Sequence, residues 1–541
     1  MLPRHCVMSV ILAVGLLSKA HGGENLEARV EAVLQTPGYQ NAHWGLLVVD
    51  LATGKKIYER NADQMFCPAS VTKLFTTSAA LDDLGSEYRF HTPVVRRGDV
   101  DPDGTLKGDL ILIAQGDLCF GGRAGPNGSL LFKDNDHSYA AGNLEAAIVP
   151  ADPLAGLDQL ARQVSEAGIK AVDGDVLIDD RLFEKASSSG SGPARVTPIL
   201  INDNVVDVVI TPGARPGEPA AVKTVPVTSF VTCDAQVETV PAGERTSLEV
   251  IAQGAQQFSV RGRVPVGHKP VVKIFAVEDP ASFARALLID LLRKHEVRVA
   301  APSSGKNSSN RLPSKSDTKA LPKVAEYTSP PFREYLKVIL KVSQNLYAST
   351  LPLLVAANHD ETSLNDGMKR EGLFLKSIGT EILTISLGGG AGGERADLVT
   401  PRATVTLLRA MSKRHDFSVL EAALPVLGQD GTLAKAVASD SPARGHARAK
   451  TGTYWVDNRL TGKTVLTSKA LAGYLDTASG KTLAFVFFLN NVPMDATGSR
   501  NSEQTAAAGR VLGKLCEVFY QSSASEESSK ARPEAAKAIR E

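Results

Sequence analysis

The chain has 541 residues, of which 43% are hydrophobic and 22% charged, and its formal net charge is +1. This length exceeds what one hydrophobic core supports and predicts roughly two to four domains. A nearly neutral chain has no bulk electrostatic attraction for nucleic acid or for an anionic membrane, so both are excluded as partners held by net charge.

The first 20 residues have the pattern of an export signal. Arg4 and His5 precede an apolar run over residues 7–17, and the short segment 18–20 ends in Ala. A bilayer span needs about 20 apolar residues, so this run is too short for a membrane anchor and we expect cleavage. The mature chain is therefore expected to be periplasmic or secreted, in a bacterium, with no membrane span.

Cysteine and histidine usage gives no metal signature. The chain has no Cys-x-x-Cys and no His-Glu-x-x-His, so we expect no metal and no other cofactor. Removal of the signal leaves an even number of cysteines, which permits disulfides in an exported chain but leaves the pairing open. These cysteines are Cys67, Cys119, Cys233 and Cys516.

The mature chain begins with a short helix, a hairpin and a second helix. Apolar residues at three- and four-residue spacing predict a helix over 24–34. A continuous apolar run predicts a strand over 44–50, which a Gly-containing turn over 52–56 leads into a second strand. A further helix is expected from Ser70 to about Leu84.

After these elements the residue composition and pattern of the chain change twice. Residues 93–301 carry short β-like runs between Gly, Pro and Asp, and we expect a β-rich insertion of one or two small domains. Residues 302–322 are polar and turn-rich, which predicts a linker. Long helices and strands return over 323–520, so this segment and residues 24–92 are expected to form one split α/β catalytic domain. Residues 521–541 have few apolar side chains and are expected to be disordered.

The first motif that carries chemistry is Ser70-Val71-Thr72-Lys73. A serine hydroxyl is a poor nucleophile while it stays protonated, and a lysine three residues later lies on the same helix face, where it can take that proton. Two further Ser-x-x-Lys tetrads, at 303–306 and 316–319, lie in the polar stretch and are interpreted as solvated pairs.

The second motif is Ser343-Gln344-Asn345, within a helical pattern over 333–357. In a regular helix, side chains two residues apart point in different directions. Both Ser343 and Asn345 can reach one cleft only if the helix is interrupted there, and we expect such an interruption.

The third motif is Lys450-Thr451-Gly452-Thr453, at the start of a predicted strand. The Lys450 ammonium and the hydroxyls of Thr451 and Thr453 suit a carboxylate, and Gly452 permits a close backbone approach. The backbone N–H groups of Thr453 and Ser70 are candidates for an oxyanion hole.

With these motifs in this order, the chain resembles the class C low-molecular-mass penicillin-binding proteins, the D-alanyl-D-alanine carboxypeptidase/endopeptidase family, over nearly its whole mature length. The resemblance implies an α/β (α+β) fold: a penicillin-recognising serine transpeptidase/β-lactamase-like catalytic domain interrupted by the β-rich insertion. The matching segments are residues 68–77, 84–90, 108–110, 201–206, 343–348, 430–433, 450–453 and 471–474.

The resemblance also implies an activity and residue roles. Peptidoglycan stem peptides would be the substrates and β-lactam antibiotics covalent inhibitors. Ser70 would attack the penultimate D-Ala carbonyl, with Lys73 as its general base. Ser343 would relay a proton to the leaving amine, Asn345 would orient Lys73 and the substrate amide, and Lys450 would hold the terminal carboxylate.

The chain departs from the family pattern at four places. Gln344 stands where the family usually has an acidic residue. Residues 389–395, Gly-Gly-Ala-Gly-Gly-Glu-Arg, replace the family's Asp-Gly-Ser-Gly-Leu-Ser-Arg loop. Gly-Asp-Leu-Cys at 116–119 replaces Gly-Asp-Pro, and extra length follows the third motif through residues 457–464.

Alternative functions remain open. A β-lactamase shares the first and third motifs, although such enzymes usually have no large insertion. A non-catalytic peptidoglycan-binding or penicillin-sensing protein on the same fold is the other alternative. Gly-Lys-Thr at 462–464 and at 480–482 lacks the leading glycine of a phosphate-binding loop, so nucleotide binding is not expected. The oligomeric state is not predicted.

Overall fold

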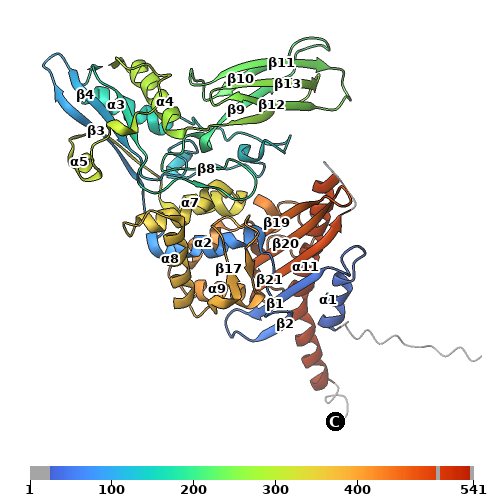
Figure 1. The fold of residues 1–541 in the computed structure, drawn as a ribbon. Coiled ribbons are helices and arrows are strands. Elements are labelled where there is room, and N and C mark those ends of the chain that lie inside the picture. Colours follow the sequence, from blue (N-terminus) through green and yellow to red (C-terminus); the bar gives the residue numbers. More distant parts are fainter. Residues whose placement is uncertain (1–24, 495–499, 536–541) are drawn as a thin grey trace, which may run out of the picture.

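A five-stranded antiparallel sheet joins the two ends of the chain in the computed structural model, which describes residues 25–494 and 500–535 (Figure 1). The expected signal at residues 1–20 lies outside the described residues. The strand order is β19-β20-β21-β1-β2. The strands are β1 (His43–Asp50), β2 (Lys56–Arg60), β19 (Ala447–Asn458), β20 (Lys463–Asp476) and β21 (Thr482–Met494).

Helices cover both faces of this sheet, which explains why β1 is buried over its whole interior and reads as a continuous apolar run. On one face, Ala470 and Phe488 of the sheet pack with helices that carry the first two motifs. On the other face, Phe487 packs with helices from both ends of the chain. The first group is α2 (Thr72–Leu84), α6 (Phe332–Lys337), α7 (Asn345–Ala357), α8 (Leu364–Ser377), α9 (Pro401–Met411) and α10 (Phe417–Ala423), and the second is α1 (Leu26–Leu34) and α11 (Arg500–Ala535).

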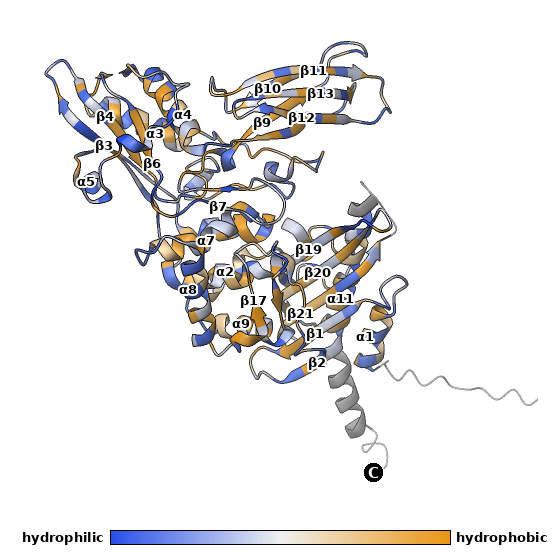
Figure 2. Ribbon diagram, in the orientation of Figure 1, coloured by the Kyte–Doolittle hydropathy of each residue, from blue (hydrophilic) through white to orange (hydrophobic). Residues whose placement is uncertain are grey.

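The segment between α2 and α6 forms separate β-rich layers above the catalytic part (Figure 1). A six-stranded sheet runs β15-β5-β4-β3-β16, with β6 also paired to β4, and two three-stranded sheets run β10-β9-β14 and β11-β13-β12. Hydrophobic residues gather where α4 and β9 meet their neighbours (Figure 2). The strands are β3 (His91–Val100), β4 (Thr105–Ile113), β5 (Ala171–Val172), β6 (Val176–Asp179), β9 (Val205–Thr211), β10 (Ala221–Val225), β11 (Thr232–Val240), β12 (Ser247–Gly254), β13 (Gln257–Pro265), β14 (Val271–Ala276), β15 (Arg298–Val299) and β16 (Lys323–Thr328), and the helices are α3 (Ala155–Glu166) and α4 (Pro280–Lys294).

The structure differs from the expected linker at 302–322. Asn307 donates to the Ile178 carbonyl, and the Arg311 guanidinium lies 2.8 Å from the Asp109 carboxylate, so this segment is tied to the six-stranded sheet. Strand β16 then pairs with β3, which adds residues 323–328 to the same sheet. The polar composition reflects side chains that bond to the sheet.

The expected disorder at 521–541 is also corrected in part, because α11 continues as far as Ala535. Ser, Ala and Glu make up most of residues 521–535, and Ala and Glu favour helix even where few apolar residues are present. The C-terminal part of the helix projects away from the catalytic part (Figure 1).

All four cysteines that the sequence leaves available for disulfides are free thiols in this part of the chain. Cys119 and Cys516 are buried, and Cys67 and Cys233 half-buried. Within residues 25–494 and 500–535, no helix combines the length and the apolar character that a membrane crossing requires.

Candidate active site

The nucleophile candidate lies in a strained turn at the start of α2. Ser70 belongs to a single 3₁₀ turn over Ala69–Val71, and Ala69 has a φ of 46°, a conformation that costs a non-glycine residue roughly 1 kcal/mol. Strand β19 crosses directly beneath, where a side chain at Gly452 would meet the Pro68 carbonyl oxygen at 2.3 Å. Gly452 therefore lets the third motif approach the first.

Lys73 lies one helical turn after Ser70, and its side chain is fully buried. Its Nζ is 2.9 Å from Ser70 Oγ, 2.7 Å from Asn345 Oδ1 and 2.7 Å from the Ala391 carbonyl oxygen. Burial lowers the pKa of Lys73 to about 7, against the opposing effect of the Asp397 charge. A neutral amine fits these contacts, since it donates to the amide and the carbonyl and offers its lone pair to the Ser70 hydroxyl.

The glycine-rich loop at residues 389–395, which departs from the family pattern, contacts the Lys73 amine through the Ala391 carbonyl. Asp397 closes the loop by accepting from the backbone N–H groups of Gly388 and Glu394, each at 2.8 Å. A Cβ at Gly390 would meet the Ala348 carbonyl oxygen at 2.2 Å, and one at Gly392 would meet the Ala69 carbonyl oxygen at 2.0 Å. The glycines thus allow the loop to pack between the nucleophile turn and α7.

The helix that carries the second motif is interrupted, as expected. A π-helical turn over Val338–Val342 ends at Ser343, which is left-handed with φ 67° and ψ 35°. Gln344 is extended, and α7 begins at Asn345. The Tyr139 hydroxyl donates to the Ser343 carbonyl at 2.6 Å, so the inserted segment holds the interruption in place.

The side chains of Asn345 and Ser343 bond to different lysines. Asn345 accepts from Lys73 and donates through Nδ2 to the Ser191 carbonyl at 2.8 Å. Ser343 Oγ accepts from Lys450 Nζ at 2.8 Å. The interruption therefore brings both side chains of the motif to one place.

Lys450 is a second fully buried amine. Besides Ser343 it donates to the Thr451 carbonyl at 2.8 Å. Burial, with the nearby charges of Lys73 and Lys469, holds the pKa of Lys450 well below its ordinary value. Along the same strand, Thr451 Oγ1 donates to Thr432 Oγ1 at 2.8 Å.

A cavity of about 600 Å³ opens in front of these groups. The buried residues Lys73, Lys450 and Gly452 are not among the residues that line it. Its lining includes Ser70, Ser343, Asn345, Thr451 and Thr453 from the catalytic part, and Asp134, Tyr139, Gly190 and Ser191 from the inserted segment.

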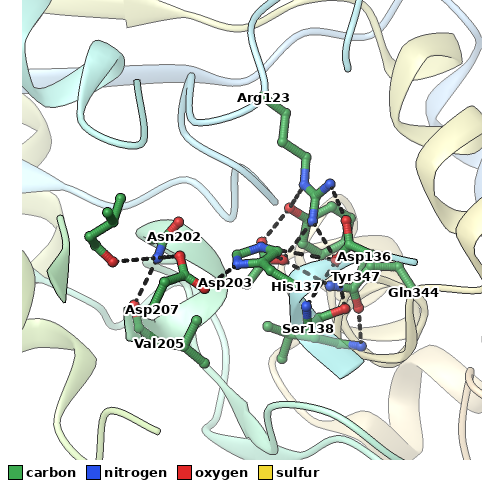
Figure 3. Close-up of polar contacts among 12 residues, drawn as sticks. Arg123, Asp136, His137, Ser138, Asn202, Asp203, Val205, Asp207, Gln344 and Tyr347 are labelled. Atoms are coloured by element: carbon green, nitrogen blue, oxygen red, sulfur yellow. Dashed lines mark hydrogen bonds and ion pairs between the residues drawn. The ribbon is translucent and has the colours of Figure 1, made fainter. Parts of the chain in front are cut away.

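A buried polar network connects the second motif to the inserted segment (Figure 3). Asp203 is its centre: the carboxylate accepts from Gln344 Nε2 at 3.0 Å, from Arg123 Nη2 at 2.8 Å and from the Tyr347 hydroxyl at 2.5 Å. His137 lies 3.1 Å from the same carboxylate. Despite the desolvation of its site, the positive charges of Arg123 and His137 hold the pKa of Asp203 far below its ordinary value.

The network also explains Gln344. A donor is required at this position because Asp203 presents a carboxylate oxygen to it. An ionised acid at residue 344 would place two like charges together in a buried site.

The same cluster is the one place in the described part of the chain where three metal-ligand side chains converge. Ligand atoms of Asp136, His137 and Asp203 lie within 4.8 Å of one another. Arg123, however, forms a bidentate pair with Asp136 and bonds Asp203, and His137 bonds Asp203 and Asp207. Two cationic side chains already supply the positive charge here, so the donor set does not fit a metal.

Several groups that shape the site had no recognisable signal as site residues. The carbonyls of Ala391 and Ser191 act through the backbone, which residue type does not encode. Asp397 follows the loop that departs from the family pattern. Asp203 falls within the matching segment 201–206, so the resemblance marks the position and the structure supplies its physical reason.

A serine beside a buried lysine whose pKa is lowered, at the edge of a cavity, is the arrangement of a serine hydrolase of the penicillin-recognising class. The model of the D-Ala-D-Ala carboxypeptidase 3 (S13) family matches residues 26–510. The chain belongs to this family, whose members are serine D-alanyl-D-alanine carboxypeptidases.

Individual relatives are similar over most of the chain. It is 28% identical to the D-alanyl-D-alanine carboxypeptidase of Actinomadura sp. (strain R39) over 489 residues, covering 84% of this chain and 81% of the relative. It is 24% identical to D-alanyl-D-alanine carboxypeptidase DacB of Haemophilus influenzae, covering 86% and 89%. The crystal structure of penicillin-binding protein 4 from Haemophilus influenzae shares the fold, with a TM-score of 0.65 at 22% identity over 90% of this chain and 98% of that one.

Proposed function

We propose that this chain hydrolyses peptidoglycan stem peptides through an acyl-enzyme on Ser70, as a D-Ala-D-Ala carboxypeptidase and endopeptidase. The observation that carries the proposal is the pairing of Ser70 Oγ with the Lys73 amine at 2.9 Å, where both other contacts of the amine are acceptors. In its neutral form the amine commits its two N–H groups to these acceptors, and its lone pair is left to accept from the Ser70 hydroxyl.

Acylation follows from this arrangement. Ser70 Oγ bonds to the carbonyl carbon of the penultimate D-Ala while its proton passes to Lys73. The backbone N–H groups of Ser70 and Thr453 are the proposed donors to the resulting oxyanion. Asn345, fixed by the Ser191 carbonyl, orients Lys73 and offers its amide to the substrate backbone.

Lys450 and the Thr451 and Thr453 hydroxyls are the proposed clamp for the substrate's terminal carboxylate. Lys450 has no acidic partner among the described residues, and burial disfavours its charged form. A bound carboxylate supplies the missing negative charge, so substrate binding favours protonation of Lys450. Gly452 contributes by keeping the strand close to Ser70.

Departure of the leaving group needs a proton at the amine nitrogen. Ser343 Oγ accepts from Lys450, which leaves its own hydroxyl proton free to pass to the amine as the C–N bond breaks. The proton that Lys73 took from Ser70 then replaces it, directly or by way of Lys450, which leaves Lys73 neutral. Water attacks the ester carbonyl, with Lys73 again accepting a proton, and hydrolysis returns Ser70.

Two further properties belong to the proposal. β-Lactam antibiotics would acylate the same serine, and one relative's structure, penicillin-binding protein 4 from Haemophilus influenzae, was solved with a β-lactam bound. Action on peptidoglycan requires the chain outside the cytoplasmic membrane, in the periplasm or secreted, which agrees with the signal expected at residues 1–20.

A fluorescent penicillin tests the proposal. We expect a stable covalent adduct on Ser70, found by mass spectrometry of the labelled peptide, together with release of D-Ala from a pentapeptide stem. Ser70→Ala should abolish both. Ser303→Ala, in a tetrad of the same spacing outside the cavity, is the matched control and should change neither.

Other outcomes would favour the alternative functions. Rapid turnover of penicillin would favour a β-lactamase. An adduct without hydrolysis of linear or crosslinked stems would favour a penicillin sensor. The absence of any adduct would favour a non-catalytic binding protein and would contradict the proposed function.

A further inference from the structure

A second cavity adjoins the catalytic one on its carboxylate-binding side. It encloses about 1100 Å³ between the β19–β20 hairpin and α11. Thr432, Thr451 and Trp455 line both cavities, so the two are continuous around the edge of β19. The hairpin reaches this far because of the extra length at residues 457–464, one of the departures from the family pattern.

Three cations line the second cavity: Lys435, Arg459 and Lys469. Lys435 and Arg459 are exposed at its rim and Lys469 is half-buried, and within residues 25–494 and 500–535 none of the three forms an ion pair with a carboxylate. The one acidic residue lining the cavity is Asp457, also without an ion pair in the described part of the chain. The cavity therefore carries a net positive charge in a chain that is nearly neutral.

Lys469 connects this charge to the catalytic cleft. Its ammonium donates to Thr453 Oγ1 at 2.8 Å. Its side chain passes over Gly509 of α11, where a Cβ would lie 3.3 Å from Lys469 Cε. Thr453 lines the catalytic cavity and Lys469 the second one, so a cation stands at the boundary between them.

We infer that the second cavity binds the carboxylate-bearing stem peptide on the leaving side of a crosslinked substrate, an inference that rests on the proposed function. A linear stem ends at the carboxylate held by Lys450 and Thr451, and nothing of it extends past Thr451. In a crosslinked substrate the leaving amine belongs to a second stem, which continues beyond this point. The second cavity begins at Thr451 and presents unpaired cations, which match the carboxylates of such a peptide.

Trp455 provides a direct signal for binding. It is 48% exposed between the two cavities, whereas the only other tryptophan, Trp44, is 3% exposed in the core and donates to the Tyr39 carbonyl. A ligand that crosses from one cavity to the other must pass Trp455. A change in tryptophan fluorescence on binding should therefore arise at this residue.

The experiment titrates Ser70→Ala protein, which cannot turn over, with a purified crosslinked stem-peptide dimer and with the linear pentapeptide. We expect the dimer to bind at least about fivefold more tightly than the linear peptide, with a fluorescence change that Trp455→Phe removes. We also expect the affinity for the dimer to fall more steeply with added salt.

A charge variant then tests the cations. Lys435→Gln/Arg459→Gln, made in both the Ser70→Ala and the Ser70 protein, should weaken dimer binding and lower kcat/KM for dimer cleavage by about five- to tenfold. Its effect on the linear pentapeptide should stay below about twofold. The matched control is Lys413→Gln/Arg245→Gln, at two exposed cations outside both cavities, and should leave both substrates unaffected.

Equal affinity for dimer and linear peptide, or an equal loss on both in the charge variant, would overturn the inference. The proposed function has a separate readout, because its failure appears as absence of a penicillin adduct on Ser70. A protein that forms the adduct and hydrolyses the pentapeptide, but binds the dimer no better than the linear peptide, would retain the proposed function and lose the second subsite.

Discussion

At the scale of single residues, the site depends on two buried amines that form no ion pair with a carboxylate in the described part of the chain. Lys73 and Lys450 are both fully buried, and the charge of Lys73 further disfavours a charge on Lys450. Their contacts are amide, hydroxyl and carbonyl oxygens, which accept hydrogen bonds but carry no full negative charge. Desolvation is therefore the main cause that lowers the pKa of both amines, and it lowers that of Lys73 to about 7, so part of Lys73 is neutral and basic near pH 7.

The first prediction concerns pH. Acylation of Ser70 needs neutral Lys73, whose pKa is about 7. The second-order rate constant for penicillin acylation should therefore rise with pH, reach half its plateau near pH 7, and fall about tenfold for each pH unit well below that value. Stopped-flow measurement with a fluorescent penicillin between pH 5 and 9 gives the profile.

Asp397→Asn is the control for this assignment. The Asp397 charge raises the pKa of Lys73, so its removal should shift the midpoint to lower pH. The asparagine retains one acceptor for the Gly388 or Glu394 N–H. A midpoint that stays in place or moves upward would contradict the assignment of the profile to Lys73.

At the scale of elements, the site is built from irregular backbone. A left-handed Ala69 precedes the nucleophile, a left-handed Ser343 ends a π-helical turn, and a loop of glycines fills the space between them. Regular helix would direct Ser343 and Asn345 apart. Each irregularity is held by a specific contact, so local strain is balanced by the packing around it.

The second prediction follows from this close packing. Gly392→Ala should lower the rate of acylation by about 100-fold, since its Cβ would lie 2.0 Å from the Ala69 carbonyl oxygen and its φ is 84°. We also expect it to destabilise the fold by more than about 1 kcal/mol. Gly389→Ala is the matched control: a Cβ there meets nothing within 4 Å, and both rate and melting temperature should be retained. Equal effects of the two substitutions would contradict this account of the loop.

Sequence reasoning reached the fold class, the first helix, the hairpin and the helix after Ser70, and the interruption at Ser343, because each has a local signal in periodicity, turn residues or spacing. The structure brings residues of all three motifs to one cavity, as the family resemblance implies. The acceptors for Lys73 and Asn345 were not predictable, since the Ala391 and Ser191 carbonyls have no side-chain identity. The prediction of a linker at 302–322 was wrong, and that of disorder at 521–541 was wrong as far as Ala535, because polar composition does not distinguish solvated chain from chain bonded to a sheet or continued as helix.

At the scale of the whole molecule, the inserted segment is part of the active site. It supplies Tyr139 to the Ser343 carbonyl, Ser191 to Asn345, and Asp203 to the buried network around Gln344 (Figure 3). Buried ion pairs of this kind are weak evidence for stability but specify one arrangement of the groups they join. We attribute to this network the fixed position of the second motif.

The third prediction tests that coupling. Asp203→Asn leaves Arg123 and His137 with less compensating charge in a buried site, and should destabilise the fold by about 3 kcal/mol. It should also slow acylation at temperatures where the protein remains folded, because Gln344 and Tyr347 bond different oxygens of Asp203 and the amide keeps only one of these two acceptors. Circular dichroism and acylation rates measure the two effects separately.

The comparison for this variant is Asp234→Asn, which removes a surface ion pair with Arg261 in the same inserted segment. Exposed pairs contribute at most about 1 kcal/mol, so this variant should keep both stability and rate. A destabilised Asp203→Asn protein with an unchanged acylation rate would show that the network supports the fold without positioning the motif.

The catalytic sheet pairs the beginning of the chain with its end, since His43 of β1 lies opposite Asn490 of β21. A growing polypeptide therefore makes its nucleophile early but cannot close the sheet beneath it until nearly all of the chain has been synthesised. The strands of the inserted segment, in contrast, pair among themselves over residues 91–328. During synthesis the β-rich inserted segment can therefore fold first, whereas the active site can form only when β21 has been made. Incomplete chains consequently lack a working catalyst.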